Sequence, residues 1–488
     1  MQTDAHRDLY RALVARDARF DGRFFVGVST TGVYCRPICP ARTPREDRCR
    51  FFARPAEAEQ AGFRACFRCR PELAPGSAPV DSVPRLVASA LARIEAGCLN
   101  EGSVEDLAAS LGVTARHLRR TMESVLSVSP IDVAQTKRLA LAKQLLQDTA
   151  LPITEIAYAS GFASLRRFQA AFAERFGAAP TAVRRKHASG ASTDDVVIRL
   201  ECRAPFDWDG LLAFLGPRAI PGVERIADGA YTRAVALRAH GVEGLVRATR
   251  AADRLKGPAI ELSIGASLLP ALSGIVPRVR ALFDLDAHPT EIARVLAADP
   301  LLAPSVAANP GLRVPGAFDG FELAVRAILG QQVSVRGATT LAHRLVERLG
   351  EPLRRDPAWS AFPSPERIAR AGASVIREIG MPMNRAAAIV GLADAVATGK
   401  VRLDPSADVP ATVGALEALP GLGPWTAQYV AMRALRSPDA FPSGDLVVQR
   451  MLDAKTPKKA EARAASWSPW RAYAVLHLWS LAARKALS

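Results

Sequence analysis

The sequence has no long apolar run. None of its 488 residues falls in a segment approaching the roughly eighteen uninterrupted apolar residues of a membrane-spanning helix, which excludes an integral membrane protein. The opening stretch is charged throughout and lacks the apolar core of a signal peptide; it reads MQTDAHRDLYRALVARDARF. We therefore expect a cytoplasmic protein with no membrane partner.

Acidic residues are in deficit. The chain has 48 Asp and Glu against 64 Lys and Arg, which gives a formal net charge of +16. Lysine and arginine neutralise phosphates and release counterions, so this imbalance favours a polyanionic partner such as nucleic acid. A basic surface can also serve solubility, and the partner must therefore be argued from motifs.

The chain is too long for a single hydrophobic core, and its composition indicates several domains. Two stretches rich in small, polar or proline residues predict linkers, at 71–84 and 187–195. The predicted parts are a cysteine-rich module at 1–78, a helical module at 82–188, a mixed region at 194–305 and a C-terminal helical domain at 306–488.

Cysteine is scarce, with seven residues, and a reducing cytoplasm disfavours a disulfide framework. Four of the seven form a C-x3-C pair followed by a C-x2-C pair: Cys35, Cys39, Cys66 and Cys69. Two such pairs complete a tetrahedral Zn²⁺ site, the alternative being four unrelated thiols. Cys49 has no partner in this pattern, and we expect Cys98 and Cys202 to be small buried hydrophobic residues.

Arginines surround the cysteine pairs. They are Arg36, Arg42, Arg45, Arg48, Arg64, Arg68 and Arg70. Four thiolates on one zinc ion carry a formal double negative charge that repels a DNA phosphate, whereas the arginines attract it. The conflict is explained if one thiolate is a nucleophile whose charge changes in the reaction. Zinc keeps a thiol deprotonated yet nucleophilic, which suits attack on an alkyl carbon.

The N-terminal region resembles the zinc domain of the bacterial Ada proteins, regulators of the adaptive response to alkylation. The resemblance covers most of residues 5–73, including TTGVYCRPICPAR and GFRACFRCRPE. It implies that the first cysteine of the set, Cys35, irreversibly accepts a methyl group from a methylphosphotriester in DNA. Cys39, Cys66 and Cys69 would then be the remaining zinc ligands.

The second part contains one helix-turn-helix pattern twice, at 103–126 and 152–177. Ser103 and Asp106 predict an N-terminal cap, and apolar residues recur at the spacing of a buried face. The interior positions predicted are Leu107, Leu111, Val113 and Leu118, then Ile156, Ala157, Phe162, Phe168 and Phe172. The pair resembles the AraC-type regulator domain, which implies DNA binding. The candidate DNA-binding side chains on the second helices include Arg119, Arg120, Arg166 and Arg167.

The last part contains LPGLG between two helical patterns. Gly421 and Gly423 permit a hairpin whose backbone amides, with the next helix N-terminus, can hold a DNA phosphate. A lone turn of this kind is often a simple helix connection. Together with FDGFELAVRAILGQQVSV and AFPSGDLVVQRM, however, it resembles the helix-hairpin-helix DNA glycosylases. Residues 196–485 are most similar to the 3-methyladenine DNA glycosylase II (AlkA) family.

Glycosidic cleavage builds positive charge on the sugar, which a nearby carboxylate stabilises. We assign this role to Asp445, whose alternative is a helix N-cap. Related enzymes that also cut the strand use a hairpin lysine where this chain has Trp425, so simple hydrolysis is expected. The resemblance implies an aromatic base pocket formed by Trp425, Tyr429 and Trp479. We expect Trp467 and Trp470 in the core, and His343 and His477 packed rather than catalytic.

One position departs from the family pattern. In the ILGQ segment the resemblance places Gln331 and Gln332 at the DNA, and Gln332 stands where the family has a leucine wedge that fills the gap left by the flipped base. A polar wedge puts lesion range and flipping efficiency in question.

The motifs together predict a multidomain, mainly α protein. It comprises a small zinc-bound α+β module, an AraC-type all-α double helix-turn-helix, a mixed α/β AlkA N-terminal domain and an all-α helix-hairpin-helix glycosylase domain. We expect a monomer that senses alkylated double-stranded DNA, activates transcription with RNA polymerase and excises alkylated bases. No PCHR motif of an O6-methylguanine methyltransferase occurs. Two alternatives are a glycosylase merely targeted to DNA by the other modules, and a regulator with an inactive glycosylase relic.

Overall fold

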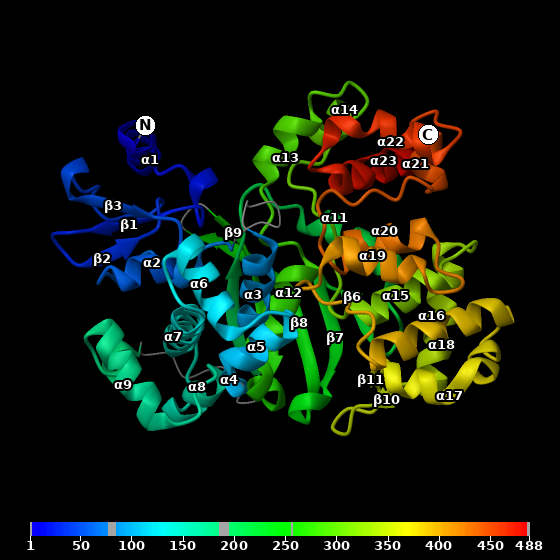
Figure 1. Ribbon diagram of the computed structural model, residues 1–488, viewed down its shortest axis with the longest axis horizontal. Helices are drawn as coiled ribbons and strands as arrows, with labels where there is room; N and C mark the ends of the chain where they lie inside the picture. The colour runs from blue at the N-terminus through cyan, green and yellow to red at the C-terminus, as the bar shows by residue number, and fades with distance from the viewer. Residues whose placement is uncertain (1, 77–83, 185–194, 255–256, 486–488) are drawn as a thin grey trace.

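The computed structural model describes residues 2–76, 84–184, 195–254 and 257–485 (Figure 1). Residues 77–83 of the first predicted linker and residues 187–194 of the second lie outside these ranges. Within them, no helix combines the length and apolar composition that a bilayer crossing requires. We refer to the four parts as the cysteine module (2–76), the helical module (84–184), the sheet domain (195–308) and the C-terminal helical domain (320–485).

The cysteine module is a small four-stranded sheet with two helices. Its elements are α1 (Gln2–Val14), β1 (Phe25–Val28), β2 (Val33–Cys35), β3 (Cys49–Phe52), α2 (Pro55–Gln60) and β4 (Arg64–Ala65). The strand order is β3-β1-β2-β4, antiparallel except for β2 and β4, which run parallel with Tyr34 opposite Ala65. Cys35 and Cys66 each follow one of these paired residues, so the register alone brings the two cysteine pairs together.

The helical module contains both predicted helix-turn-helix units. Its helices are α3 (Arg85–Glu95), α4 (Cys98–Glu101), α5 (Val104–Ser110), α6 (Ala115–Leu126), α7 (Pro130–Asp148), α8 (Ile153–Ala159), α9 (Leu165–Phe176) and α10 (Pro180–Val183). The predicted capping box is confirmed, because the Ser103 and Asp106 side chains each accept a hydrogen bond from the other residue's backbone N–H. The predicted apolar positions are buried except Leu111 and Val113, which are partly buried.

The sheet domain is built on a five-stranded antiparallel sheet of order β5-β9-β8-β7-β6. Its elements are β5 (Asp195–Glu201), α11 (Trp208–Leu215), β6 (Glu224–Ala227), β7 (Ala230–Leu237), β8 (Val242–Arg254), β9 (Gly257–Gly265), α12 (Leu272–Leu282), α13 (Pro289–Leu296) and α14 (Ala303–Ala308). The β5 strand confirms the predicted start of a strand-rich region. As an edge strand, β5 leaves one side free to face another part of the chain.

The C-terminal helical domain is helical apart from one pair of two-residue strands. Its elements are α15 (Gly320–Leu329), α16 (Val335–Leu349), β10 (Glu351–Pro352), β11 (Ser360–Ala361), α17 (Pro365–Arg377), α18 (Met383–Ala397), α19 (Val409–Glu417), α20 (Pro424–Arg433), α21 (Leu446–Met451), α22 (Pro457–Arg463) and α23 (Arg471–Lys485). Trp467 and Trp470 are buried as predicted, in a core shared with α13 and α14.

The parts share apolar and polar contacts. The largest apolar core combines side chains of the cysteine module, the helical module and the sheet domain, including Tyr34, Leu145 and Ile198. Between the first two parts, the Arg70 guanidinium pairs with Asp148 at 2.6 Å (Nη1 to Oδ1). In Figure 1 the blue cysteine module accordingly lies beside the helical module and the green sheet.

The prediction for Cys98 is wrong. Cys98 is exposed rather than buried, because it begins the one-turn helix α4 and its neighbour Leu99 takes the inward position. His343 is partly buried: its side chain is 37% exposed and its Nε2 lies 3.4 Å from Glu347 on the same helix face. Cys202 and His477 are buried as predicted, and the His477 Nδ1 lies 3.0 Å from the Ser305 hydroxyl oxygen.

Candidate functional site

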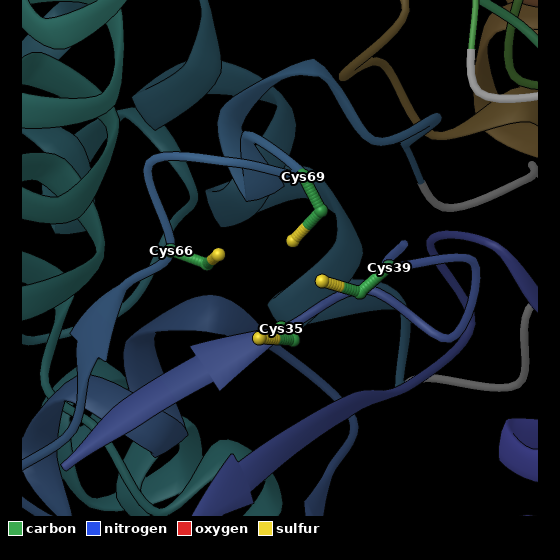
Figure 2. Close-up of side chains that lie close together, drawn as sticks. All are labelled: Cys35, Cys39, Cys66 and Cys69. Carbon is green, nitrogen blue, oxygen red and sulfur yellow. The ribbon is translucent and has the colours of Figure 1, made fainter. Parts of the chain in front are cut away.

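The four predicted cysteines meet in one cluster. Cys35 ends β2, Cys39 follows the next turn, Cys66 follows β4 and Cys69 lies three residues further on. Their Sγ atoms all lie within 4.8 Å of one another and converge on one point, as Figure 2 shows. Zn–S bonds of about 2.3 Å separate tetrahedral sulfur ligands by about 3.8 Å. The cluster therefore fits Zn²⁺, whose four ligands are then supplied by the chain.

The environment of the cluster stabilises thiolates. The backbone N–H of Arg36 donates to the Cys69 Sγ, and that of Arg68 to the Cys66 Sγ, each at 3.4 Å. As whole residues Cys39 and Cys69 are buried, whereas Cys35 and Cys66 are partly exposed. Hydrogen bonds to ligating sulfur are the usual outer support of a metal site, because they fix its geometry and moderate its charge.

The arginines near the cluster fall into two groups. Five of the seven are exposed, namely Arg42, Arg45, Arg48, Arg64 and Arg68. The other two are buried: Arg36 pairs with Asp21 and Glu201, and Arg70 with Glu72 and Asp148. The expectation that all seven arginines attract a phosphate is therefore wrong for Arg36 and Arg70, because their paired carboxylates already neutralise their charges.

Cys49 does not belong to the metal cluster. It begins β3, and its thiol donates to the Arg45 carbonyl oxygen at 3.3 Å. Burial, with the charges of Glu46 and Asp47 adding to it, raises the pKa of Cys49 to about 11. A thiol with this pKa is protonated at neutral pH and is a poor nucleophile.

Asp445 is a helix N-cap, which is the alternative role that the sequence suggests for it. It precedes α21, and its Oδ1 accepts hydrogen bonds from the backbone N–H groups of Val447 and Val448, both at 3.0 Å. The cap orients the carboxylate and places it at the positive end of the helix dipole.

The same carboxylate receives two indole N–H groups. The Nε1 of Trp425 donates to its Oδ2 at 3.1 Å, and the Nε1 of Trp479 to its Oδ1 at 3.2 Å. The third predicted pocket residue, Tyr429, stacks on Trp425 with ring centroids 5.3 Å apart and lies 6.4 Å from Trp479. The structure therefore brings Asp445 and all three predicted aromatic residues into one site.

Sequence reasoning missed three further residues of this site. Phe214, from α11 of the sheet domain, stacks on Trp479 with centroids 6.3 Å apart. The Arg218 and Arg433 guanidinium groups lie over the Phe214 ring, at 3.8 Å and 5.1 Å. Phe214 lies in the apolar stretch LLAFLG, where no local signal separates it from an ordinary core residue.

Two arginines change the chemistry of Tyr429. Burial acts to raise the pKa of Tyr429, but the charges of Arg433 and Arg218 outweigh it and lower the pKa below its usual value. Arg433 also donates from Nη1 to the Tyr429 hydroxyl oxygen at 2.6 Å. The tyrosine is thus held in place beside Trp425 and Trp479.

The predicted hairpin connects α19 to α20. Gly421 is exposed with φ +85°, and Gly423 caps α20 without a side-chain hydrogen bond, leaving helix N–H groups available to a phosphate. The Gln331 side chain braces this hairpin, donating to the Gly421 carbonyl oxygen at 3.1 Å and to the Thr426 hydroxyl at 3.0 Å. Gln332 is exposed, with φ +57°.

The four predicted DNA-binding arginines of the helical module are all exposed. Arg119 and Arg120 lie on α6, where Arg119 pairs with Glu105 at 2.8 Å. Arg166 and Arg167 lie in the first turn of α9, a helix at the outer edge of the molecule in Figure 1. They are placed where a DNA duplex can reach them.

Four known domain families match the chain in succession. They are described as the metal binding domain of Ada (residues 8–72), a helix-turn-helix domain (107–186), the AlkA N-terminal domain (197–319) and an HhH-GPD superfamily base excision DNA repair protein (325–472). A Mycobacterium tuberculosis protein described as a probable bifunctional transcriptional activator/DNA repair enzyme AlkA is 40% identical over 483 residues, covering 96% of this chain and 95% of its own.

This chain belongs to the family of Ada/AlkA fusion proteins. Its glycosylase half is also 36% identical over 280 residues to DNA-3-methyladenine glycosylase 2 of Escherichia coli, covering 57% of this chain and 95% of that one. A solved 3-methyladenine DNA-glycosylase from Archaeoglobus fulgidus shares the fold, with a TM-score of 0.51 and 23% identity over 59% of this chain and 98% of that one. The Ada/AlkA fusion thus joins a zinc-binding module and a DNA-binding regulator domain to a base-excision glycosylase.

Proposed function

We propose that this Ada/AlkA fusion protein both senses and repairs alkylated DNA. Cys35 accepts a methyl group from a DNA methylphosphotriester, and this methylation activates transcription. The glycosylase part excises alkylated bases such as 3-methyladenine by simple hydrolysis. The single observation that carries the repair activity is the Asp445 carboxylate clamped by two indole N–H groups; the four convergent cysteines support the sensor.

The methyl transfer is a substitution at carbon. The Cys35 sulfur attacks the methyl carbon, an S–C bond forms, the C–O bond to the phosphate breaks, and the phosphodiester leaves with its negative charge. Zn²⁺ on Cys35, Cys39, Cys66 and Cys69 supplies deprotonated yet nucleophilic sulfur at neutral pH. The exposed arginines of the module would hold the DNA backbone.

The signal would be a change of charge. Methylation turns one thiolate into a neutral thioether, so the formal charge of the loaded site falls from two negative units to one. Weaker repulsion of phosphate raises DNA affinity, and the helix-turn-helix units, through Arg119, Arg120, Arg166 and Arg167, add sequence preference.

We propose RNA polymerase as the partner, the cytoplasm as location, a monomer as the active form, and domains at 1–78, 82–188, 194–305 and 306–488.

Base excision would proceed by hydrolysis. The bond from the sugar C1′ to the base nitrogen breaks, its electrons leave with the base, and water adds at C1′ with loss of a proton. The Asp445 carboxylate stabilises the positive charge on the sugar and orients the water. Trp425, Tyr429 and Trp479 stack on the flipped cationic base. Gly421 and Gly423 hold the backbone, Gln331 contacts the DNA, and Gln332 lies at the gap left by the flipped base.

The alternative is a glycosylase whose other modules only deliver it to DNA. It predicts affinity without a preferred sequence and no response to methylation. A regulator with an inactive glycosylase is disfavoured because Asp445 retains both its cap and its indole donors.

The acceptor role is tested by mass. The protein is incubated with methylphosphotriester DNA and digested, and the Cys35 peptide should gain about 14 Da, one CH2 in net mass. The matched control is Cys49→Ser, which removes a thiol of the same module outside the cluster and should leave the gain intact. An unmodified Cys35 peptide, or the gain on another cysteine, would reject the assignment.

The catalytic role is tested with Asp445→Asn. Asparagine keeps a good N-cap but removes the charge, so we expect 3-methyladenine release to slow by about 100-fold or more while DNA binding persists. Asp319 also caps a helix of the same domain, α15, and Asp319→Asn is the control for loss of a capping carboxylate. Equal release rates from the two variants would rule Asp445 out.

A further inference from the structure

The residue that follows Cys35 is buried between two parts of the molecule. The Arg36 side chain is 1% exposed. Its guanidinium donates to both carboxylate oxygens of Asp21, with Nε 2.8 Å from Oδ1. Its Nη1 lies 2.7 Å from the Glu201 Oε2, in β5 of the sheet domain. One arginine of the metal-binding motif is therefore held by a carboxylate of the glycosylase half.

Arg36 also contacts the second cysteine pair. Its backbone N–H donates to the Cys69 Sγ at 3.4 Å, and its Nη1 donates to the Cys69 carbonyl oxygen at 3.2 Å. Because Arg36 is bonded to Cys35 and hydrogen-bonded to Cys69, it connects the two arms that supply the cluster. Any rotation of the Arg36 side chain would break its hydrogen bond to the Cys69 carbonyl oxygen.

Glu201 is fixed by its own strand. It is 2% exposed and pairs in register with Ala259 of β9, while Arg199 approaches its Oε1 at 3.5 Å. Two residues further along, Arg203 donates to the carbonyl oxygens of Asp21 at 3.2 Å and Gly76 at 2.8 Å. Glu201 at the end of β5 and Arg203 just beyond it therefore both contact the cysteine module.

The Glu201 carboxylate is the second partner of the buried Arg36 guanidinium, after Asp21. A buried guanidinium is stable only when its donors are satisfied, and removing one partner leaves it free to reorient. Asp21 occupies the Nε and Nη2 edge of Arg36, whereas Glu201 faces Nη1, the atom that also bonds Cys69. Glu201 therefore forms an ion pair with the same Arg36 nitrogen that donates to the Cys69 carbonyl oxygen.

We propose that Glu201 is a positioning residue of the metal centre, acting through Arg36 on Cys69. The inference rests on the proposed zinc ligands. The metal centre is then fully assembled only when the sheet domain is docked, so the glycosylase half contributes to the sensor half. Outer supports of this kind typically change metal affinity by about 10- to 100-fold.

The test uses the full chain with Glu201→Gln, which keeps the shape of the side chain and removes its charge. Zinc transfer to a chromogenic chelator is timed, and we expect release about 10-fold faster than in wild type. The matched control is Glu243→Gln on β8 of the same sheet, where the carboxylate pairs with Arg354. With Co²⁺ in place of zinc, the thiolate charge-transfer bands should shift in Glu201→Gln and not in the control, and Glu201→Asp should restore them in part.

Each outcome decides one question. A wild-type chain that holds no zinc overturns the proposed ligand set itself. Zinc-loaded wild type with Glu201→Gln matching the control in release rate and Co²⁺ spectrum overturns the role of Glu201 alone. Should Glu201→Gln not fold, Arg36→Lys serves instead, because lysine keeps the charge but cannot contact Asp21, Glu201 and Cys69 together; wild-type zinc release by that variant overturns the proposal.

Discussion

At the scale of single residues, Asp445 caps α21, and our proposal gives the same carboxylate a catalytic role. Two backbone N–H groups of α21 and two indole N–H groups share its oxygens. A carboxylate with four donors cannot rotate, so its charge stays directed at the space beside the aromatic residues. Capping is therefore compatible with the proposed catalytic role rather than a competing explanation for Asp445.

His477 makes the C-terminal helical domain sensitive to acid. Burial lowers the pKa of His477 to about 4 from an ordinary 6.5. The unfolded chain therefore binds the proton first as pH falls, and the stability present above about pH 6.5 is lost toward pH 4. This group should cost about 2 kcal/mol of stability between pH 7 and pH 5.

The measurement is the free energy of unfolding in urea at both pH values. The decrease should be smaller in His477→Gln than in wild type. His343→Gln, which removes the half-exposed histidine of the same domain, should leave the decrease at the wild-type size. A decrease in the free energy of unfolding between pH 7 and pH 5 that is as large in His477→Gln as in wild type would contradict this account.

At the scale of elements, the hairpin between α19 and α20 needs only one of its two glycines for its conformation. Gly421 has φ +85°, and a Cβ there would lie 2.7 Å from the Ala388 Cβ. Gly423 has φ −96°, and a Cβ there meets nothing within 4 Å. The two positions are therefore not equivalent, although the sequence LPGLG presents them alike.

Gly421→Ala should destabilise the hairpin by about 1–3 kcal/mol, the usual cost of a non-glycine residue in this strained backbone region, with the clash in addition. Gly423→Ala is the matched control for an added methyl group in the same turn. Thermal unfolding should show a lower melting temperature for Gly421→Ala and a near wild-type value for Gly423→Ala. Equal melting temperatures would show that the hairpin tolerates both substitutions.

Strand pairing likewise explains how the cysteines meet. The C-x3-C and C-x2-C spacings predict two ligand pairs that share one Zn²⁺ ion, but not how the fold brings the pairs together. The parallel pairing of β2 with β4 does this, because the Cys66 N–H donates to the Tyr34 carbonyl oxygen at 3.0 Å and sets Cys66 beside Cys35.

At the scale of the whole molecule, the cysteine module, the helical module and the sheet domain share one apolar core. Shared packing makes independent motion of the cysteine module, helical module and sheet domain costly. A chemical change at the cysteines therefore occurs in a module that is already packed against the helical module and the sheet domain.

If methylation activates promoter binding, methylated protein should protect a defined DNA site in a footprint. Replacing Arg166 and Arg167 together by Gln should weaken that binding by about 10-fold or more and reduce its salt dependence. The control removes two charges elsewhere, with Arg294→Gln and Arg354→Gln, exposed arginines paired on other domains. Uniform affinity for all sequences, without protection, would favour the alternative of a DNA-delivered glycosylase.

The sequence by itself determined the features that depend on neighbouring residues: the cysteine spacing, the Ser103 cap, the buried faces of the helix-turn-helix units and the hairpin turn. Only the tertiary structure decided which distant groups meet. The Trp479 indole donates to Asp445, 34 positions away in the sequence, and Phe214 of another domain stacks on Trp479. Glu201 of the sheet domain pairs with the buried Arg36. Local patterns report short-range sterics and hydrogen bonding, whereas ion-pair partners and stacked rings are set by the folding of the whole chain.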